Sequence, residues 1–280
     1  MIASTPRKKP LLPRLACISL MLIAMLYLAA AAYMGINQRS FLYRVAPDWI
    51  APETQGIPRS EAYQLTMPDG VTLRGWRIPP TRPDALTYLY FHGNARGLDR
   101  RAGRFRLMTA DGSGLVALSH RGFGGSGGAP TEALLHQDAE AIYREITKTV
   151  PPGRLVIFGE SLGTGISLNL ARKVPTKAII LDSPYLSILA RASASYPWLP
   201  VSWILQDTFR SDQWIGAVKT PILIVHGTED RVVPVTDSEK LATLGNKATI
   251  TRIVYPGEPH VVPYDRGPNR DVPAFLAGLN

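Results

Sequence analysis

Residues 159–163 read Gly-Glu-Ser-Leu-Gly, and this short segment constrains the fold of the chain more than any other feature. The apolar run Leu155–Phe158 precedes it directly, and the helix-compatible stretch Ile166–Arg172 follows it. A strand that turns sharply into a helix crowds the backbone at the turn, so small residues two positions either side of Ser161 allow the close crossing. The motif also occurs by chance, but its context predicts a strand, a tight turn and a helix that expose Ser161 as a nucleophile.

A serine nucleophile needs a base within hydrogen-bond reach, and the base needs a group that fixes its tautomer. In folds with this turn the order along the chain is serine, acid, histidine. The chain holds five histidines, at positions 92, 120, 136, 226 and 260. Only His226 and His260 follow Ser161, and His226 precedes every acid in its own loop. His260 is therefore the predicted base by elimination.

Two carboxylates are candidates for the acid. Asp230 lies in the loop after the apolar run Pro221–Val225, and Asp182 ends the preceding run, Ala178–Leu181. Both positions fit a parallel sheet whose site lies at the carboxyl ends of the strands, because neighbouring loops meet there. We favour Asp230, and we interpret the adjacent Glu229 as a solvated loop carboxylate.

Acyl transfer also requires preorganised donors for the oxyanion. The backbone N–H of Leu162, the residue after the nucleophile, is the first candidate. The second should lie in the loop that follows the predicted strand Thr87–Phe91, where Gly93 lets the backbone approach a substrate; we predict the N–H of Asn94. His92 is then expected to orient this loop and not to act as a base.

Taken together, these motifs resemble the α/β-hydrolase superfamily, most closely its membrane-anchored serine hydrolases and the serine aminopeptidase and monoacylglycerol lipase-like groups. The resemblance runs from about Tyr63 to the C-terminus and rests on the segments 92–94, 120–127, 159–163 and 226–230 and on His260. It implies a mostly parallel central sheet covered by helices on both faces, with Ser161, Asp230 and His260 as the charge-relay residues. The chain departs from the pattern after His260, where Val261–Tyr264 and a Gly-Pro pair stand in place of a prompt helix.

A second glycine motif, G-x-G-x-x-G at residues 122–127, is also the fingerprint of a dinucleotide site. In such a site the helix begins at once and an acidic residue ends a strand about 20 residues later. Here Gly128–Pro130 intervenes, and the acids at that distance fall within the helical pattern Thr131–Lys148. We therefore interpret the motif as a tight loop beside the site. No His, Cys and carboxylate residues stand at ligand spacing, so we expect neither a metal nor another cofactor.

The N-terminus has the pattern of a membrane anchor. Residues 1–14 form a basic arm, and the uncharged stretch 15–36 reaches the ~20 residues that a spanning helix needs. Alanines at 29–32 also permit a cleavable signal peptide, although hydrophobicity that resumes through Ile36 favours an anchor. The basic arm predicts a cytoplasmic N-terminus and an extracytoplasmic catalytic domain, periplasmic in a bacterium. Cys17 is the single cysteine and lies within the span, so no internal disulfide is expected.

The formal net charge of +9 raises the question of a nucleic-acid partner. Four of the positive charges lie in the basic arm, and the rest of the chain is only modestly basic and carries no nucleic-acid motif. We therefore expect no nucleic-acid partner. A local cluster, Arg96, Arg100, Arg101, Arg104 and Arg106, is interpreted as an exposed helix face, with contact to lipid phosphate as the alternative.

The remaining organisation is that of one α/β domain, residues 61–280, after a linker or strap at 37–60. Two strands near 62–67 and 71–78 flank the turn Pro68–Gly70, and strands near 87–91, 115–119, 155–159, 178–182, 222–226 and 250–254 alternate with helical patterns. The aromatic-rich insertion 184–218 is either a small cap that forms an acyl pocket or a segment packed on the sheet edge.

These features favour a membrane-anchored serine hydrolase that cleaves carboxylic esters, with lipid or thioester acyl groups included. A serine peptidase of the aminopeptidase-like group is the alternative within the same chemistry. A non-catalytic binding protein of the same fold and a nucleotide-dependent enzyme are the alternatives from other classes. The acyl substrate and the oligomeric state are beyond the sequence, because a fold does not determine a function.

Overall fold

The computed structural model describes residues 11–247 and 249–279. These residues form two compact units, one ending at Phe41 and one that begins at Leu42. The first unit is a single long helix and the second holds the sheet, so each is described by itself.

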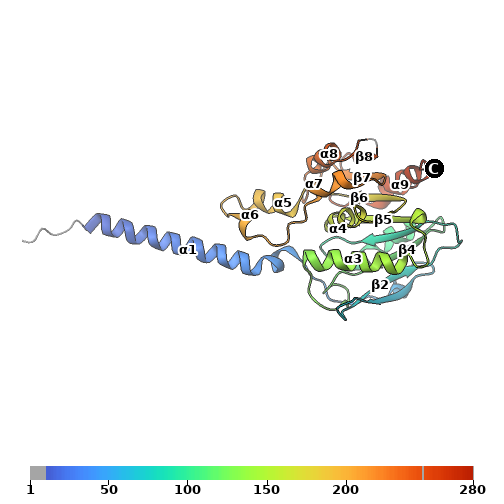
Figure 1. The fold of residues 1–280 in the computed structure, drawn as a ribbon, viewed down its shortest axis with the longest axis horizontal. Coiled ribbons are helices and arrows are strands. Elements are labelled where there is room, and N and C mark those ends of the chain that lie inside the picture. The colour runs from blue at the N-terminus through green and yellow to red at the C-terminus, as the bar shows by residue number, and fades with distance from the viewer. Residues whose placement is uncertain (1–10, 248, 280) are drawn as a thin grey trace, which may run out of the picture. The chain divides into compact units, whose positions relative to one another are not determined.

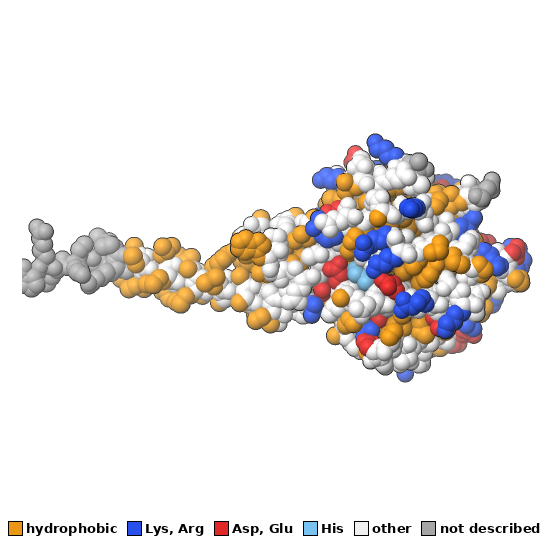
Figure 2. All heavy atoms as spheres, in the orientation of Figure 1, with side chains coloured by type: hydrophobic (Ala, Val, Ile, Leu, Met, Phe, Trp, Pro, Cys, Tyr) orange, Lys and Arg blue, Asp and Glu red, His pale blue; other side chains and the backbone are white. Residues whose placement is uncertain are grey.

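Helix α1 spans Leu11–Leu42. It forms the first unit except for its last residue, Leu42, which is the first residue of the second unit. Its stretch Leu15–Leu42, 28 residues, is long and apolar enough to cross a membrane, since ~20 residues suffice. Apolar side chains cover its surface (Figure 2). The helix continues six residues past the predicted limit of the span at Ile36, because the polar residues that follow do not break it; Asn37 Nδ2, for example, donates to Tyr33 O at 2.9 Å. Most of the predicted basic arm, residues 1–14, lies outside the described residues.

The segment after α1 runs over the domain as a strap. The carbonyls of Ala46 and Pro47 accept hydrogen bonds from the Gly124 and Gly125 amides, at 2.7 and 2.8 Å. Further along, the Trp76 indole N–H donates to Ile50 O at 3.0 Å, before the 3₁₀ turn Pro52–Gln55. Two amides of the G-x-G-x-x-G loop, those of Gly124 and Gly125, therefore bind this strap, and helix α3 begins only at Glu132.

The domain is built on an eight-stranded sheet in the order β1-β2-β4-β3-β5-β6-β7-β8 (Figure 1). The strands are β1 (Glu61–Thr66), β2 (Thr72–Ile78), β3 (Thr87–Phe91), β4 (Gly114–Leu118), β5 (Leu155–Glu160), β6 (Ala178–Asp182), β7 (Ile222–Gly227) and β8 (Ile250–Tyr255). The pairs β1–β2 and β2–β4 are antiparallel, and all pairs from β4 to β8 are parallel. The predicted mostly parallel sheet with an antiparallel start is confirmed.

Helices cover both faces of the sheet because its inner strands are apolar on both sides. Along β5, Ile157 packs in one core with α3 (Glu132–Ile146) and α4 (Leu162–Ala171), whereas the next residue, Phe158, packs in a second core with α2 (Ala102–Met108) and α9 (Pro268–Ala277). The two cores follow from the alternation of side chains along a strand. The expected α/β layers are thus present.

The strand order places the ends of β3 and β5 side by side. The strand order reverses at this point, because β4 lies on one side of β3 and β5 lies on the other. Phe91, the last residue of β3, pairs with Gly159 of β5. In open parallel sheets, ligands bind at the carboxyl edge where such a reversal opens a crevice. The loops after Phe91 and Glu160 therefore meet where a site is expected.

The insertion between β6 and β7 contains three short helices, α5 (Ile188–Ser195), α6 (Val201–Ile204) and α7 (Ser211–Trp214), and the 3₁₀ turn Ile215–Ala217. Its ends are buried through Tyr185 and Phe209, whereas its outer part exposes Trp203 to 89%. Helix α8 (Val235–Leu244) packs in the same core as α3 and α4, and the 3₁₀ turn Tyr264–Arg266 packs in the core of α2 and α9. Two other 3₁₀ turns are Leu98–Arg101 and Pro152–Arg154.

Candidate active site

Ser161 lies at the turn between β5 and α4, with φ 49° and ψ −115°. A positive φ at a residue with a side chain is strained and persists only where the surroundings enforce it. The flanking glycines show why the turn is so tight: a Cβ on Gly163 would lie 2.0 Å from Phe91 O, and one on Gly159 would lie 2.7 Å from Gly163 O. The close crossing that the motif predicts therefore depends on the absence of side chains at both positions.

His260 connects Ser161 to Asp230. Its Nε2 lies 2.9 Å from Ser161 Oγ, and its Nδ1 lies 2.7 Å from Asp230 Oδ2. A carboxylate next to Nδ1 places the imidazole proton there and leaves Nε2 free to accept from the serine hydroxyl. The structure thus brings together the three residues predicted from chain order, although they are 30 and 99 positions apart.

Asp230 is held at both oxygens. Its Oδ1 accepts from the N–H groups of Val232 and Val233, both at 2.8 Å, and its Oδ2 also lies 3.0 Å from His226 Nε2. Burial by itself raises the pKa of Asp230, but the hydrogen bonds from His226, His260 and Val233 outweigh it and hold the pKa below its usual value. Asp230 is therefore an anion that fixes the orientation of His260.

His226 is a contact of the site that sequence reasoning missed. Its place ahead of Asp230 in the chain argues against a role as the base, yet its fully buried ring faces the carboxylate. The ring Nε2 also lies 3.1 Å from Val233 O, so two acceptors surround it and require an N–H at that position. The sequence did carry a signal for this contact: His226, near the end of β7, stands four residues before Asp230.

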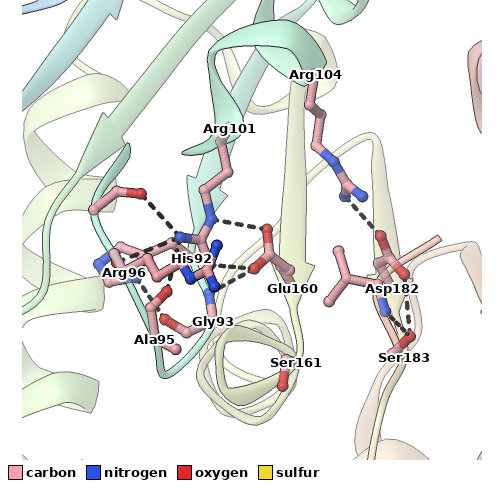
Figure 3. Close-up of polar contacts among 12 residues, drawn as sticks. His92, Gly93, Ala95, Arg96, Arg101, Arg104, Glu160, Ser161, Asp182 and Ser183 are labelled. Atoms are coloured by element: carbon pink, nitrogen blue, oxygen red, sulfur yellow. Dashed lines mark hydrogen bonds and ion pairs between the residues drawn. The ribbon is translucent and has the colours of Figure 1, made fainter. Parts of the chain in front are cut away.

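Asp182, the alternative acid, faces a different partner. Its Oδ2 accepts from Arg104 Nη1 at 2.6 Å (Figure 3). Its Oδ1 accepts from Val262 N at 3.3 Å. Burial raises the pKa of Asp182, although Arg104 opposes the effect. Because Arg104 also donates to Val262 O at 2.7 Å, this ion pair holds the loop that carries His260.

The loop after β3 reaches Ser161 through Gly93: a Cβ on this glycine would lie 3.3 Å from Ser161 Cβ. The orientation of the loop follows from two buried histidines. The backbone N–H of His120 donates to His92 Nε2 at 2.9 Å. The proton of a neutral His92 is therefore on Nδ1, which lies 2.7 Å from Gly93 O. Burial, with a contribution from the neighbouring His120, lowers the pKa of His92 well below its usual value and keeps the ring neutral.

The Gly93–Asn94 peptide therefore has a defined direction. In a trans peptide the N–H points opposite to the C=O, so fixing Gly93 O toward His92 turns the Asn94 N–H to the other side. The Asn94 side chain is used elsewhere: its Nδ2 donates to Leu42 O, and its Oδ1 accepts from Arg44 N at 3.3 Å. Leu162 is the first residue of α4, where N–H groups have no partner within the helix. Leu162 directly follows the nucleophile, and Asn94 directly follows Gly93, which lies close to Ser161; their use as oxyanion donors stays a prediction.

The interpretation of the arginine cluster as an exposed helix face is wrong for two of its members. The side chains of Arg101 and Arg104 are only 10% and 8% exposed, whereas Arg100 is 65% exposed. Figure 3 shows Arg101 directed at Glu160 and Arg104 at Asp182. The physical reason is helical spacing: positions 101 and 104 share a face with the buried Phe105 and Met108.

Comparisons with known proteins show similarity to hydrolases. Residues 82–214 match the profile of the serine aminopeptidase family S33. An uncharacterised Mycobacterium tuberculosis protein, Rv2307c, is 30% identical over 250 residues, which cover 87% of this chain and 89% of the relative. The lysophosphatidylserine lipase ABHD12 of Danio rerio is 32% identical over 231 residues, 69% of this chain but 60% of that protein's length. The esterase Pf2001 of Pyrococcus furiosus has the same fold, with a TM-score of 0.65 at 21% identity over 84% of this chain and 96% of that one.

Proposed function

The chain belongs to the α/β-hydrolase superfamily, and from this premise we propose that it is a membrane-anchored serine hydrolase that cleaves carboxylic esters. One observation carries the proposal. His260 lies 2.9 Å from Ser161 Oγ and 2.7 Å from Asp230 Oδ2, which is the arrangement that activates a serine.

In the proposed reaction, Ser161 Oγ attacks the ester carbonyl carbon while His260 Nε2 takes the hydroxyl proton. The imidazolium that forms is stabilised by the Asp230 carboxylate. The carbonyl oxygen becomes an oxyanion, which accepts hydrogen bonds from the N–H groups of Leu162 and Asn94. His260 then gives its proton to the leaving alcohol as the C–O bond breaks. In the second half, His260 takes a proton from water while the water oxygen attacks the acyl carbonyl carbon. The bond to Ser161 Oγ then breaks, His260 returns the proton to Oγ, and the acid leaves.

Two features support an acyl-lipid substrate. The zebrafish relative is by name a lysophosphatidylserine lipase, so esters with a single acyl chain on a glycerol backbone are the first to test. The outer part of the insertion, residues 184–218, exposes large apolar side chains, among them Trp198 at 52% and Trp203 at 89%. Such a surface suits contact with an acyl chain better than contact with a polar peptide. Thioesters require the same chemistry and belong in the same panel.

The second candidate function is a serine peptidase, which the match to the serine aminopeptidase profile favours. The attacking group, base and oxyanion donors would be the same, but His260 would protonate an amine leaving group. An aminoacyl amide tested beside a matched ester separates the two functions.

We propose that α1 anchors the enzyme with the N-terminus in the cytoplasm and the catalytic domain on the opposite side. The support is the candidate span Leu15–Leu42 and the basic residues ahead of it. A periplasm-dependent reporter fused after residue 280 should be active and a cytoplasm-dependent one inactive. The reverse pattern would refute this topology, and soluble mature protein that begins near Ala32 would refute the anchor.

The test of the catalytic proposal is covalent labelling with a fluorophosphonate, followed by a panel of esters and amides. Ser161→Ala should abolish both labelling and turnover and leave the protein folded, because it removes a single hydroxyl. Ser193→Ala, at an exposed serine of α5, is the matched control and should label as the wild type does. Labelling that persists in Ser161→Ala would show that another residue is the nucleophile.

A further inference from the structure

The residue before the nucleophile, Glu160, is a buried acid that the proposed reaction does not use. It is 3% exposed, and a buried carboxylate is unfavourable unless charges and hydrogen bonds compensate it. Both of its oxygens are occupied. Oε1 accepts from Arg101 Nη2 and from Gly93 N at 3.3 Å, while Oε2 accepts from Arg101 Nε at 3.1 Å and from the Tyr90 hydroxyl. Burial raises the pKa of Glu160, but Arg101 outweighs it and lowers the pKa overall, so the group is an anion.

The other side of the Arg101 guanidinium binds the oxyanion loop. Its Nη1 donates to the carbonyls of Ala95, Arg96 and Gly97, at 2.9, 3.3 and 2.9 Å. Arg96 has a positive φ of 64°, a strained conformation for a residue with a side chain. Three carbonyls that converge on one cation explain how the loop keeps this shape (Figure 3).

We propose that Arg101 is a positioning residue, which joins the oxyanion loop to the nucleophile turn and so sets the place of the Asn94 N–H relative to Ser161. One planar group bonds the carboxylate that precedes Ser161 and the three carbonyls that follow Asn94. Gly93 N–H donates to the same carboxylate, so the loop is fixed on both sides of Asn94. This role rests on the proposed function, because an oxyanion donor matters only for acyl transfer.

The decisive variant is the double substitution Arg101→Met with Glu160→Gln. It removes both charges together and so avoids a lone buried ion, which would be strongly destabilising. The new side-chain amide at position 160 can still accept from Gly93 N–H and bond Tyr90, whereas the three loop carbonyls lose their donor. With the panel ester, we expect kcat to fall about 10²-fold, the usual effect of losing one oxyanion donor, with KM within about twofold. The acidic limb of the pH–rate profile should stay in place, since His260 and Asp230 are untouched.

Two single variants complete the experiment. Arg101→Lys keeps the charge but lacks the planar fork that spans carboxylate and carbonyls, so kcat should fall with little change in thermal stability. Arg100→Met, at the exposed neighbouring arginine, should match the wild type. Wild-type kcat in the folded double variant, or in Arg101→Lys where the double variant does not fold, would overturn the positioning role. Absence of turnover in the wild type itself would overturn the proposed function, and this proposal with it.

Discussion

Asp230→Asn tests the proposed triad most sharply, because the structure determines which way the new amide must point. The Oδ1 position accepts from two backbone N–H groups, those of Val232 and Val233, each at 2.8 Å. An NH₂ group placed there would face two donors. The amide oxygen therefore takes this position, and Nδ2 replaces Oδ2 opposite His260 and His226.

This orientation forces His260 into the wrong tautomer. A donor opposite Nδ1 requires Nδ1 to accept, so the imidazole proton moves to Nε2, where it points at Ser161 Oγ. His260 can then no longer take the serine proton. The same exchange in a serine protease lowers kcat by about 10⁴-fold, equivalent to about 5 kcal/mol of barrier. We expect a loss of that order here, with KM changed far less.

The assay is steady-state hydrolysis of an activated ester by the full-length enzyme, with thermal unfolding to verify the fold. Glu229→Gln, at the exposed neighbouring carboxylate, is the matched control and should retain wild-type kcat. Asp182→Asn should lower stability through loss of the Arg104 ion pair while keeping most of the activity. A damaging Asp182→Asn beside a mild Asp230→Asn would refute the assignment of the acid.

Three further outcomes are expected. In a pH–rate profile, kcat/KM should fall on acidification as the base becomes protonated, and this acidic limb should be absent in His260→Gln. A chelator should have no effect, and loss of activity on chelation would indicate a metal-bound water. Burial lowers the pKa of His120 to about 4, so on acidification the unfolded chain binds a proton at this histidine at a higher pH than the folded protein does. The free energy of unfolding should therefore decline by up to about 3 kcal/mol as pH falls from ~6.5 toward that value. Denaturant titrations of the wild type and His120→Gln measure this, and equal pH slopes would contradict it. Trp203→Ala should shift the preference among acyl-chain lengths if the insertion contacts the acyl chain, whereas an unchanged profile would favour the edge-packing interpretation.

Local pattern was enough to predict the sheet and the nucleophile turn. The predicted strands agree with the observed ones to within one residue, because apolar runs bounded by glycine, proline and polar residues are decided by neighbours in the sequence. Chain order also pointed to His260, which lies beside Ser161, and to Asp230, which lies beside His260. The roles of these residues remain predictions that the variants above test.

Local sequence patterns could not predict the contacts between segments that are distant in the chain. Arg101 lies 59 positions from Glu160, and Arg104 lies 78 from Asp182, so no local rule pairs them. Their helix does carry a signal, since Leu98, Phe105 and Met108 mark an apolar face that includes position 101. The number of arginines in this segment suggested a solvated surface. Only the periodicity of its apolar residues would have predicted that two of the arginines are buried.

Buried ion pairs hold two of the loops that form the site. Arg101 binds the oxyanion loop to the nucleophile turn, and Arg104 binds the His260 loop to the end of β6. Both side chains come from one short stretch, residues 101–104, so two loops that meet at Ser161 share one rigid support. Each arginine is compensated by its own carboxylate, which makes the pairs costly to break singly and tolerable to remove together. When both members of a pair are removed together, the site should lose geometry before it loses fold, and this is why kcat, more than thermal stability, is the informative measurement for the paired variant.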